Sequence, residues 1–340
     1  MYLEDVIASV DATHKGLGKL VAMCQLAVVA RKIMLIVSPS GCGKSTAMSY
    51  VSKTYGANVM RTDSTSRTGL VHRASELDCS DRLIVVDDLS TTQTPYARAS
   101  TMTALAALCY SHEVHSDMGD ISFSIENFNG SVLVGIQPVI LKELLLVPEW
   151  EGTIKDKVIR YYHLRRPTEP ALHEPACVLK NADIGTVELH EPDKENIYWQ
   201  HLFRLGLMEF SRARAKEHLI DLLKASCALD GRTKVTQDDY EMLELLLRQF
   251  VFEVISINKK ELEGDRELNR NLMNLLTEYY SYEGEFSLGQ VATDYQVTLQ
   301  QCYKIMKTQS VYWNEITKSP TTYKPTQHLT KILKKYNLEA

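Results

Sequence analysis

Residues 38–46, SPSGCGKST, combine glycine, lysine and hydroxyl side chains in the spacing of a phosphate-binding loop. Such a loop works because successive backbone N–H groups and a helix N-terminus face anionic oxygens. Lys44 is expected to reach the β- and γ-phosphates, and the Ser45 hydroxyl to bind Mg²⁺. The residues predicted to hold ATP are Ser38, Pro39, Ser40, Gly41, Cys42, Gly43, Lys44, Ser45 and Thr46.

Ser38 stands where these loops usually carry their first glycine. That position makes the turn from strand to loop, where a small side chain can suffice. We therefore expect the loop to keep its function.

An acidic pair follows the apolar run LIVV, at Asp87 and Asp88. Asp87 is expected to hold Mg²⁺ through water, and Asp88 to orient or deprotonate the attacking water. Two acids after a buried strand also fit the start of a solvated loop, but the phosphate-binding loop favours the catalytic interpretation.

The elements that must position these groups follow from hydrophobic patterning. Apolar runs predict buried strands at residues 33–37, 82–90, 131–138 and 158–165. Helices are predicted over 14–31 and 95–112, and a hairpin within 113–128 that turns at Gly119. Strands alternating with helices indicate an α/β fold with a mostly parallel sheet, which binds ligands at the carboxyl ends of its strands.

Composition sets limits on the class of protein. The 340 residues, 44% hydrophobic and 24% charged, suffice for two or three domains, and the net charge of -5 excludes a uniformly basic surface but not a basic patch. The seven cysteines form no C-x-x-C pair, so a reducing compartment such as a cytoplasm that contains DNA is expected. The apolar run at 20–29 is too short to span a membrane.

With Gln137 ending the run SVLVGI, the loop and the acidic pair make residues 14–165 resemble the ATPase core of the AAA+ family. The resemblance implies that Gln137 is the first sensor, between the acidic pair and the γ-phosphate. A turn-forming strand end would explain the same residue without that role. The family usually has Asp-Glu where this chain has Asp87-Asp88, although initiator and loader ATPases of the wider family use Asp-Asp. Slow hydrolysis is one expectation that follows from this departure.

Residues 211–243 resemble the lid helix pair of the MoxR and minichromosome-maintenance branch. The shared pattern is an arginine opening a helix, an alanine-rich middle, a G-R turn and V-T-x-x-D. It implies that Arg214, with Arg212 as the alternative, touches the γ-phosphate as second sensor. The branch also has a pore hairpin that grips nucleic acid; the hairpin predicted here carries no lysine or arginine, which argues against such a grip.

The AAA+ resemblance further implies an arginine finger that acts on the nucleotide of a neighbouring subunit. The segment before the last core strand offers Arg160, with Lys157 as a poorer alternative because ammonium lacks the planar fork of guanidinium. A structural salt bridge is the competing interpretation of Arg160. The implied assembly is a homo-oligomeric ring or filament, with a hexamer among the candidate ring sizes.

Residues 266–338 have the element order of a winged-helix domain. Residues 296–338 carry seven lysines against one acid, Glu315, for a local charge of +6. Lysines without arginine favour phosphate contact over base reading, so we expect DNA binding through this unit. Winged helices also bind proteins, so a protein partner is the alternative.

The predicted architecture is an AAA+ core over 1–166, a connection over 167–195, a helical lid over 196–260 and a winged helix over 265–340. The predicted function is an ATP-hydrolysing motor or switch that acts on DNA in replication initiation, as a helicase or as a helicase loader. The alternatives are a MoxR-like protein remodeller and a slow ATP-dependent assembly switch. The short region before the loop is typical of a compact viral or mobile-element version.

Overall fold

The computed structural model describes residues 2–56, 58–62, 65, 67–89, 94–118, 121–163, 182–189, 192, 196–248, 250, 286–289, 292, 298–308, 313–318, 320–327 and 330. A five-stranded sheet in the order β2-β3-β6-β1-β7 forms its centre, with every neighbouring pair parallel. The strands are β1 (Ile33–Val37), β2 (Val59–Thr62), β3 (Leu83–Val86), β6 (Ser131–Ile136) and β7 (Val158–Tyr162). The predicted α/β class with a parallel sheet is confirmed.

Alternate residues of the strands enter two separate cores. Met34 and Ile36 of β1 pack in the cluster that contains α2 (Gly18–Val29) and α3 (Lys44–Tyr55). Leu35 of the same strand packs in a second cluster, formed with α6 (Pro95–Ser111) and α7 (Pro138–Leu145). Burial on both faces explains why β1 reads as a continuous apolar run instead of an alternating one.

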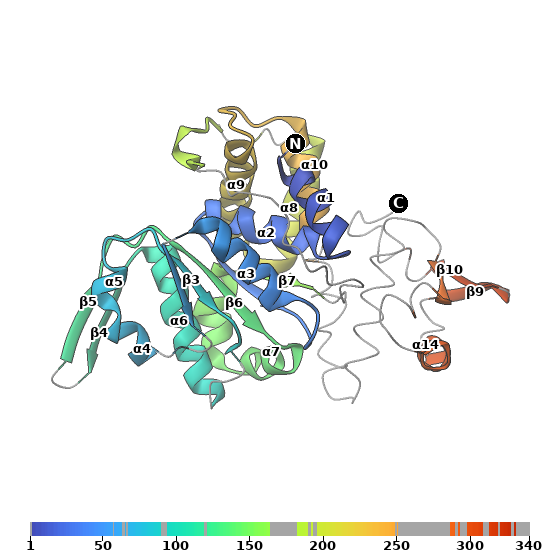
Figure 1. Ribbon diagram of the computed structural model, residues 1–340, viewed down its shortest axis with the longest axis horizontal. Helices are drawn as coiled ribbons and strands as arrows, with labels where there is room; N and C mark the ends of the chain where they lie inside the picture. Colours follow the sequence, from blue (N-terminus) through green and yellow to red (C-terminus); the bar gives the residue numbers. More distant parts are fainter. Residues whose placement is uncertain are drawn as a thin grey trace.

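Several elements match their predicted positions. The helix predicted over 95–112 is α6, and α2 occupies most of 14–31. The predicted hairpin is present as β4 (Val114–Met118) paired antiparallel with β5 (Ile121–Ile125), and it projects from the sheet beside α5 (Ala74–Leu77) (Figure 1). Its predicted turn residue, Gly119, lies outside the described residues.

Other elements were not predicted from the sequence. They are α1 (Tyr2–Thr13), β2, α4 (Arg67–His72), α5, α7, a π-helical turn at Trp150–Ile154 and 3-10 turns at Lys155–Lys157 and Ile184–Thr186. The edge strand β2 is short and only partly buried, so it lacks the apolar run that marks the central strands. No helix of the described parts of the chain is long and apolar enough to cross a membrane.

Three helices form a second unit: α8 (Ile197–Glu209), α9 (Arg212–Leu229) and α10 (Gln237–Leu247). Thr236 caps α10 in a reciprocal capping box with Asp239. Arg232 donates to both carboxylate oxygens of the fully buried Asp239, at 2.7 and 2.8 Å. The G-R and V-T-x-x-D pattern of the sequence is therefore the network that joins α9 to α10.

The C-terminal part contains α14 (Leu299–Thr308) and a three-stranded antiparallel sheet in the order β8-β10-β9. Its strands are β8 (Phe286–Ser287), β9 (Trp313–Lys318) and β10 (Thr321–Pro325). A helix followed by a hairpin has the order expected of the second half of a winged helix. The winged helix stays a prediction, because residues 251–285, in which the predicted domain begins, lie outside the described residues, as do Lys331, Lys334 and Lys335.

Candidate nucleotide-binding site

The phosphate-binding loop joins β1 to α3, as its mechanism requires. Gly41 and Gly43 have φ angles of 79° and 83°, in the left-handed region that only glycine adopts without strain. Lys44 is the first residue of α3 and is buried, whereas Ser45 and Thr46 are exposed at the helix N-terminus. Strand, loop and helix thus follow one another in the order that a phosphate-binding loop requires.

The structure explains why serine replaces glycine at position 38. Among the described residues, the non-glycine positions with positive φ do not include Ser38, so a side chain there causes no backbone strain. Ser38 is fully buried, and its backbone N–H donates to the Ile136 carbonyl oxygen at 3.0 Å. The loop therefore begins anchored to the end of the neighbouring strand β6.

The acidic pair and Gln137 lie at the same edge of the sheet as the loop. Asp87 and Asp88 follow β3, Gln137 follows β6, and β6 lies between β3 and β1. The Gln137 side-chain amide donates to Asp88 Oδ2 at 3.4 Å. Since neighbouring strands are about 4.8 Å apart, the acids stand roughly two strand spacings from the loop, which leaves room for a phosphate and a water.

Gly135 allows this close assembly. A Cβ atom at this position would lie 2.3 Å from the Asp87 carbonyl oxygen and 3.1 Å from the Met48 methyl group. The first distance is far below van der Waals contact with rigid backbone, so any side chain would push β6 away from the acidic segment.

Sequence analysis missed Arg61, which lies on the edge strand β2. Its guanidinium donates to both carboxylate oxygens of Asp87, at 2.8 and 2.9 Å. The pair is only partly exposed, with 38% of the Arg61 side chain and 17% of the Asp87 side chain accessible. A lone arginine in the short segment VMRT gave no signal of this role, because its partner is distant in sequence.

The described residues include no group of three or more His, Cys, Asp or Glu side chains arranged to hold a metal ion. Mg²⁺ in phosphate-binding loops keeps several waters and uses one or two protein oxygens plus the phosphates. Ser45 and Asp87 offer oxygens of this kind, so the residues present fit a Mg²⁺–nucleotide complex.

The comparison with known families decides the type of this loop. Residues 14–68 match the Rad17 P-loop domain family. The match covers 55 of the 340 residues and ends before the acidic pair. None of the curated proteins compared with the chain matches it.

The Rad17 P-loop match and the loop geometry agree. The matched residues contain α2, β1, the loop, α3 and β2, which together form the strand–loop–helix part of the sheet. The N-terminal region is therefore similar to the Rad17 P-loop domain, and the parallel α/β sheet agrees with a P-loop fold. The match does not reach residues 211–243, so the MoxR and minichromosome-maintenance resemblance remains untested.

Arg160 does not fit the predicted finger. It lies within β7, is fully buried, and pairs with the fully buried Glu209 at 3.0 Å. Its guanidinium also donates to the carbonyl oxygens of Lys155 and Glu209 at 2.9 and 3.0 Å. A side chain enclosed in this way cannot reach a neighbouring subunit, and the geometry favours the structural salt bridge.

Arg214 also lies away from the predicted position. Its guanidinium stacks on the Tyr110 ring, 3.9 Å from the centroid, and pairs with Glu217 at 2.7 Å. Glu217 lies 3.9 Å from Lys32, which directly precedes β1. Arg214 is therefore at the amino ends of the strands, whereas the loop is at their carboxyl ends.

The distance between these two edges of the sheet excludes contact between Arg214 and a nucleotide in the P-loop of the same subunit. Lys32 and Ser38 flank β1, and a strand advances about 3.3 Å per residue, so roughly 20 Å separates them. Figure 1 shows the same separation, with α8, α9 and α10 at the top of the view and α7, which follows the carboxyl end of β6, at the bottom. Arg212, the alternative second sensor, opens α9 on the Arg214 side of the sheet.

Proposed function

We propose that this protein is an ATP-hydrolysing AAA+ ATPase that assembles into oligomers and acts on DNA. The observation that carries the proposal is the meeting of three groups at the carboxyl edge of the sheet: the P-loop with Lys44, the acidic pair, and Gln137. The Rad17 P-loop match supports the nucleotide-binding half of the proposal.

The roles of the residues follow from their positions. Backbone N–H groups of the loop and Lys44 would hold the phosphates, and Ser45 with Asp87 would hold Mg²⁺, whose charge offsets that of the transferred phosphoryl group. Asp88 would orient the attacking water, and Gln137, which already contacts Asp88, would hold that carboxylate in place.

A shared site between subunits needs a basic group from elsewhere than Arg160. Lys157 and Arg214 both lie against Tyr110, with the Lys157 ammonium 5.3 Å from the ring centroid. This basic pair lies at the sheet edge opposite the P-loop, so it could reach only the nucleotide of an adjacent copy. Arg214 is the better candidate because its planar guanidinium can contact two phosphate oxygens at once.

The proposal that the protein acts on DNA rests on the C-terminal unit. Exposed Lys307 and Lys324 belong to its local excess of seven lysines over one acid. Helicase action, helicase loading and clamp loading are the DNA-related activities consistent with an AAA+ core. The assignment to the MoxR and minichromosome-maintenance branch rests on the α9–α10 pair. If the protein does not bind DNA, a protein remodeller is the alternative function.

A second candidate, a slow ATP-dependent assembly switch, is favoured by the Arg61–Asp87 pair. Both oxygens of the predicted metal-binding carboxylate are occupied by Arg61. Nucleotide and Mg²⁺ would have to compete with this contact, which favours a low basal rate.

A Lys44→Ala variant tests the nucleotide site, with Lys53→Ala as control because Lys53 is an exposed lysine of the same helix. ATP at 100 times its Kd should stabilise the wild type and the control by about 2.7 kcal/mol, and the Lys44 variant much less. ATPase activity that rises with protein concentration would support the shared site. Equal stabilisation of both variants by ATP would refute the site.

DNA binding is measured separately on the full chain. Affinity for duplex DNA should fall with salt by about 0.9 log units per phosphate neutralised, for each tenfold rise in salt. Stimulation of the ATPase by a protein and never by DNA would instead identify a remodeller.

A further inference from the structure

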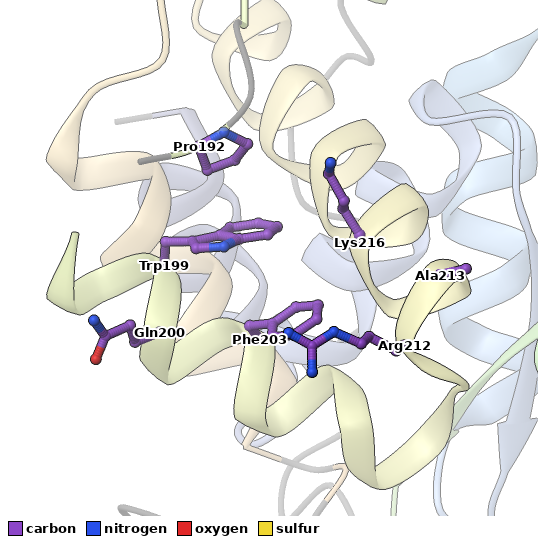
Figure 2. A pocket seen from close by; sticks show the side chains of 7 residues that line it. All are labelled: Pro192, Trp199, Gln200, Phe203, Arg212, Ala213 and Lys216. Carbon is purple, nitrogen blue, oxygen red and sulfur yellow. The ribbon is translucent and has the colours of Figure 1, made fainter. Parts of the chain in front are cut away.

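A cavity of about 600 Å³ lies between α8 and α9, apart from the P-loop. Its lining residues are Pro192, Trp199, Gln200, Phe203, Arg212, Ala213 and Lys216. Figure 2 shows the two aromatic rings projecting from α8 into the space between the helices, with the two basic side chains of α9 beside them. The volume is within the range of ligand pockets, roughly 300–1,000 Å³.

The aromatic side chains form a continuous surface. The rings of Trp199 and Phe203 are stacked, with centroids 5.6 Å apart and planes inclined by 23°. Only 6% of Trp199 is accessible, so the partly exposed Phe203 supplies the open ring surface at the cavity, and Trp199 holds that ring in place. Stacked aromatic faces are the surface on which planar ligands bind.

The cationic side chains give the cavity its second property. The Arg212 guanidinium lies 5.6 Å from the centroid of the Phe203 ring, and Lys216 lies one turn further along α9. A ligand stacked on the rings would therefore meet positive charge at its edge.

The start of α9 is rich in basic residues, of which Arg214 pairs with Glu217 of the same helix. Its first five residues include Arg212, Arg214 and Lys216, and its first turn contains no acid. Ser211, at the N-cap, makes no side-chain capping hydrogen bond. The Ser211 N–H donates to Asp156 Oδ1 at 2.7 Å, so a carboxylate already lies at this helix end, and the positive charge beside the cavity comes from Arg212 and Lys216.

We propose that this cavity binds a nucleotide unit, with its base on the accessible part of the Phe203 ring, next to Trp199, and its phosphate beside Arg212 and Lys216. A base provides the planar face and a phosphate the negative charge, which is the combination used in single-strand binding surfaces. The site lies on the helical unit and does not depend on hydrolysis at the P-loop, so the proposal goes beyond the ATPase function.

Fluorescence of Trp199 tests the proposal in the full-length protein. The signal of this residue is the difference between the wild type and a Trp199→Phe variant, because Trp150 and Trp313 remain in both. Adenosine monophosphate and a six-residue oligothymidylate are the two probes. Each should quench the difference signal, and tighter binding of the oligonucleotide would identify a strand as the source of the unit.

Variants of the lining residues separate the cavity from other nucleotide sites. Phe203→Leu keeps the apolar volume, removes the π-face and should weaken binding by about 5-fold or more, the lower end of the effect of losing a stacked aromatic ring. Arg212→Gln should reduce the salt dependence of oligonucleotide binding by about 0.7 log units per tenfold change in salt. Arg204→Gln is the matched control, since Arg204 is an exposed arginine of α8 outside the cavity.

The outcomes are decisive even if the Trp199 variant fails to fold, because Phe203→Leu retains Trp199 and reports on the same quenching. The proposal is overturned if neither probe quenches the fluorescence, or if Arg204→Gln weakens binding as much as Arg212→Gln. Equal quenching by a glutamate-rich peptide would show a general anionic surface and would also overturn it. Lys44→Ala should leave the quenching unchanged, so failure of the ATPase proposal would be distinguishable.

Discussion

The Arg61 guanidinium donates to both carboxylate oxygens of Asp87, the residue that we propose binds Mg²⁺. Arg61 comes from the edge strand β2 and Asp87 from the end of the adjacent β3. The proposed nucleotide-binding edge of the sheet therefore contains a basic group that would compete with Mg²⁺ for Asp87.

Removing Arg61 should make the metal easier to bind. A partly exposed ion pair contributes on the order of 1 kcal/mol or less, so Arg61→Gln should lower the Mg²⁺ concentration for half-maximal ATP binding by up to about 5-fold. Isothermal titration across Mg²⁺ concentrations measures this. The control is Arg82→Gln, since Arg82 precedes the other end of β3 and pairs with Glu76. A higher Mg²⁺ requirement in the Arg61 variant would mean that Arg61 positions Asp87 for the metal.

Arg160 is expected to support the fold and not the chemistry. Arg160→Met would leave Glu209 buried without its cation, which costs about 3–5 kcal/mol of unfolding free energy. The double variant Arg160→Met, Glu209→Leu removes both charges and should recover most of that loss. Urea denaturation of the three proteins measures the effect. A stable Arg160 variant that binds ATP but cannot hydrolyse it would restore the finger interpretation.

The buried position of His218 predicts that the folded protein loses stability in mild acid. Burial, followed by the nearby Lys32 charge, lowers the pKa of His218 to about 4 from its ordinary 6.5. The unfolded chain therefore binds a proton that the folded chain does not between these values, and stability falls as the pH drops from 6.5 towards 4. The full loss is about 3 kcal/mol.

The variant His218→Gln isolates this effect. The imidazole Nε2 lies 3.0 Å from the Asp156 carbonyl oxygen, and a glutamine amide can donate to the same oxygen without titrating. The free energy of unfolding of the wild type, relative to this variant, should decrease between pH 7 and pH 5. Parallel pH profiles would contradict the assignment.

We expect Arg214 to affect the ATPase rate only through contact with the nucleotide of an adjacent subunit. If its guanidinium contacts the nucleotide of an adjacent copy, Arg214→Ala should lower the ATPase rate by roughly 10³-fold or more while leaving ATP affinity nearly unchanged. Mixing Arg214→Ala with Lys44→Ala should then restore part of the activity, because the second variant supplies the arginine to the first. Full activity of Arg214→Ala alone would restrict Arg214 to its contacts with Tyr110 and Glu217.

The nucleotide edge of the sheet was predictable because local patterns define it. The P-loop needs a strand, two glycines and a helix in unbroken order, and the acids and Gln137 each end a buried apolar run. The order of the strands in the sheet could not be predicted from the sequence. Only the strand pairing shows that β6 lies between β1 and β3 and brings Gln137 to Asp88.

The sequence by itself determined the P-loop, the acidic pair, the parallel α/β class and the capping network of the α9–α10 turn, since each depends on neighbouring residues. Only the tertiary structure decided the roles of Arg61, Arg160 and Arg214. An arginine can extend to partners far along the chain, so its role depends on which edge of the sheet it occupies and on whether a carboxylate already holds it. Packing alone buries Arg160 beside Glu209 and places Arg214 roughly one strand length from the P-loop. No local spacing in the sequence encodes either position.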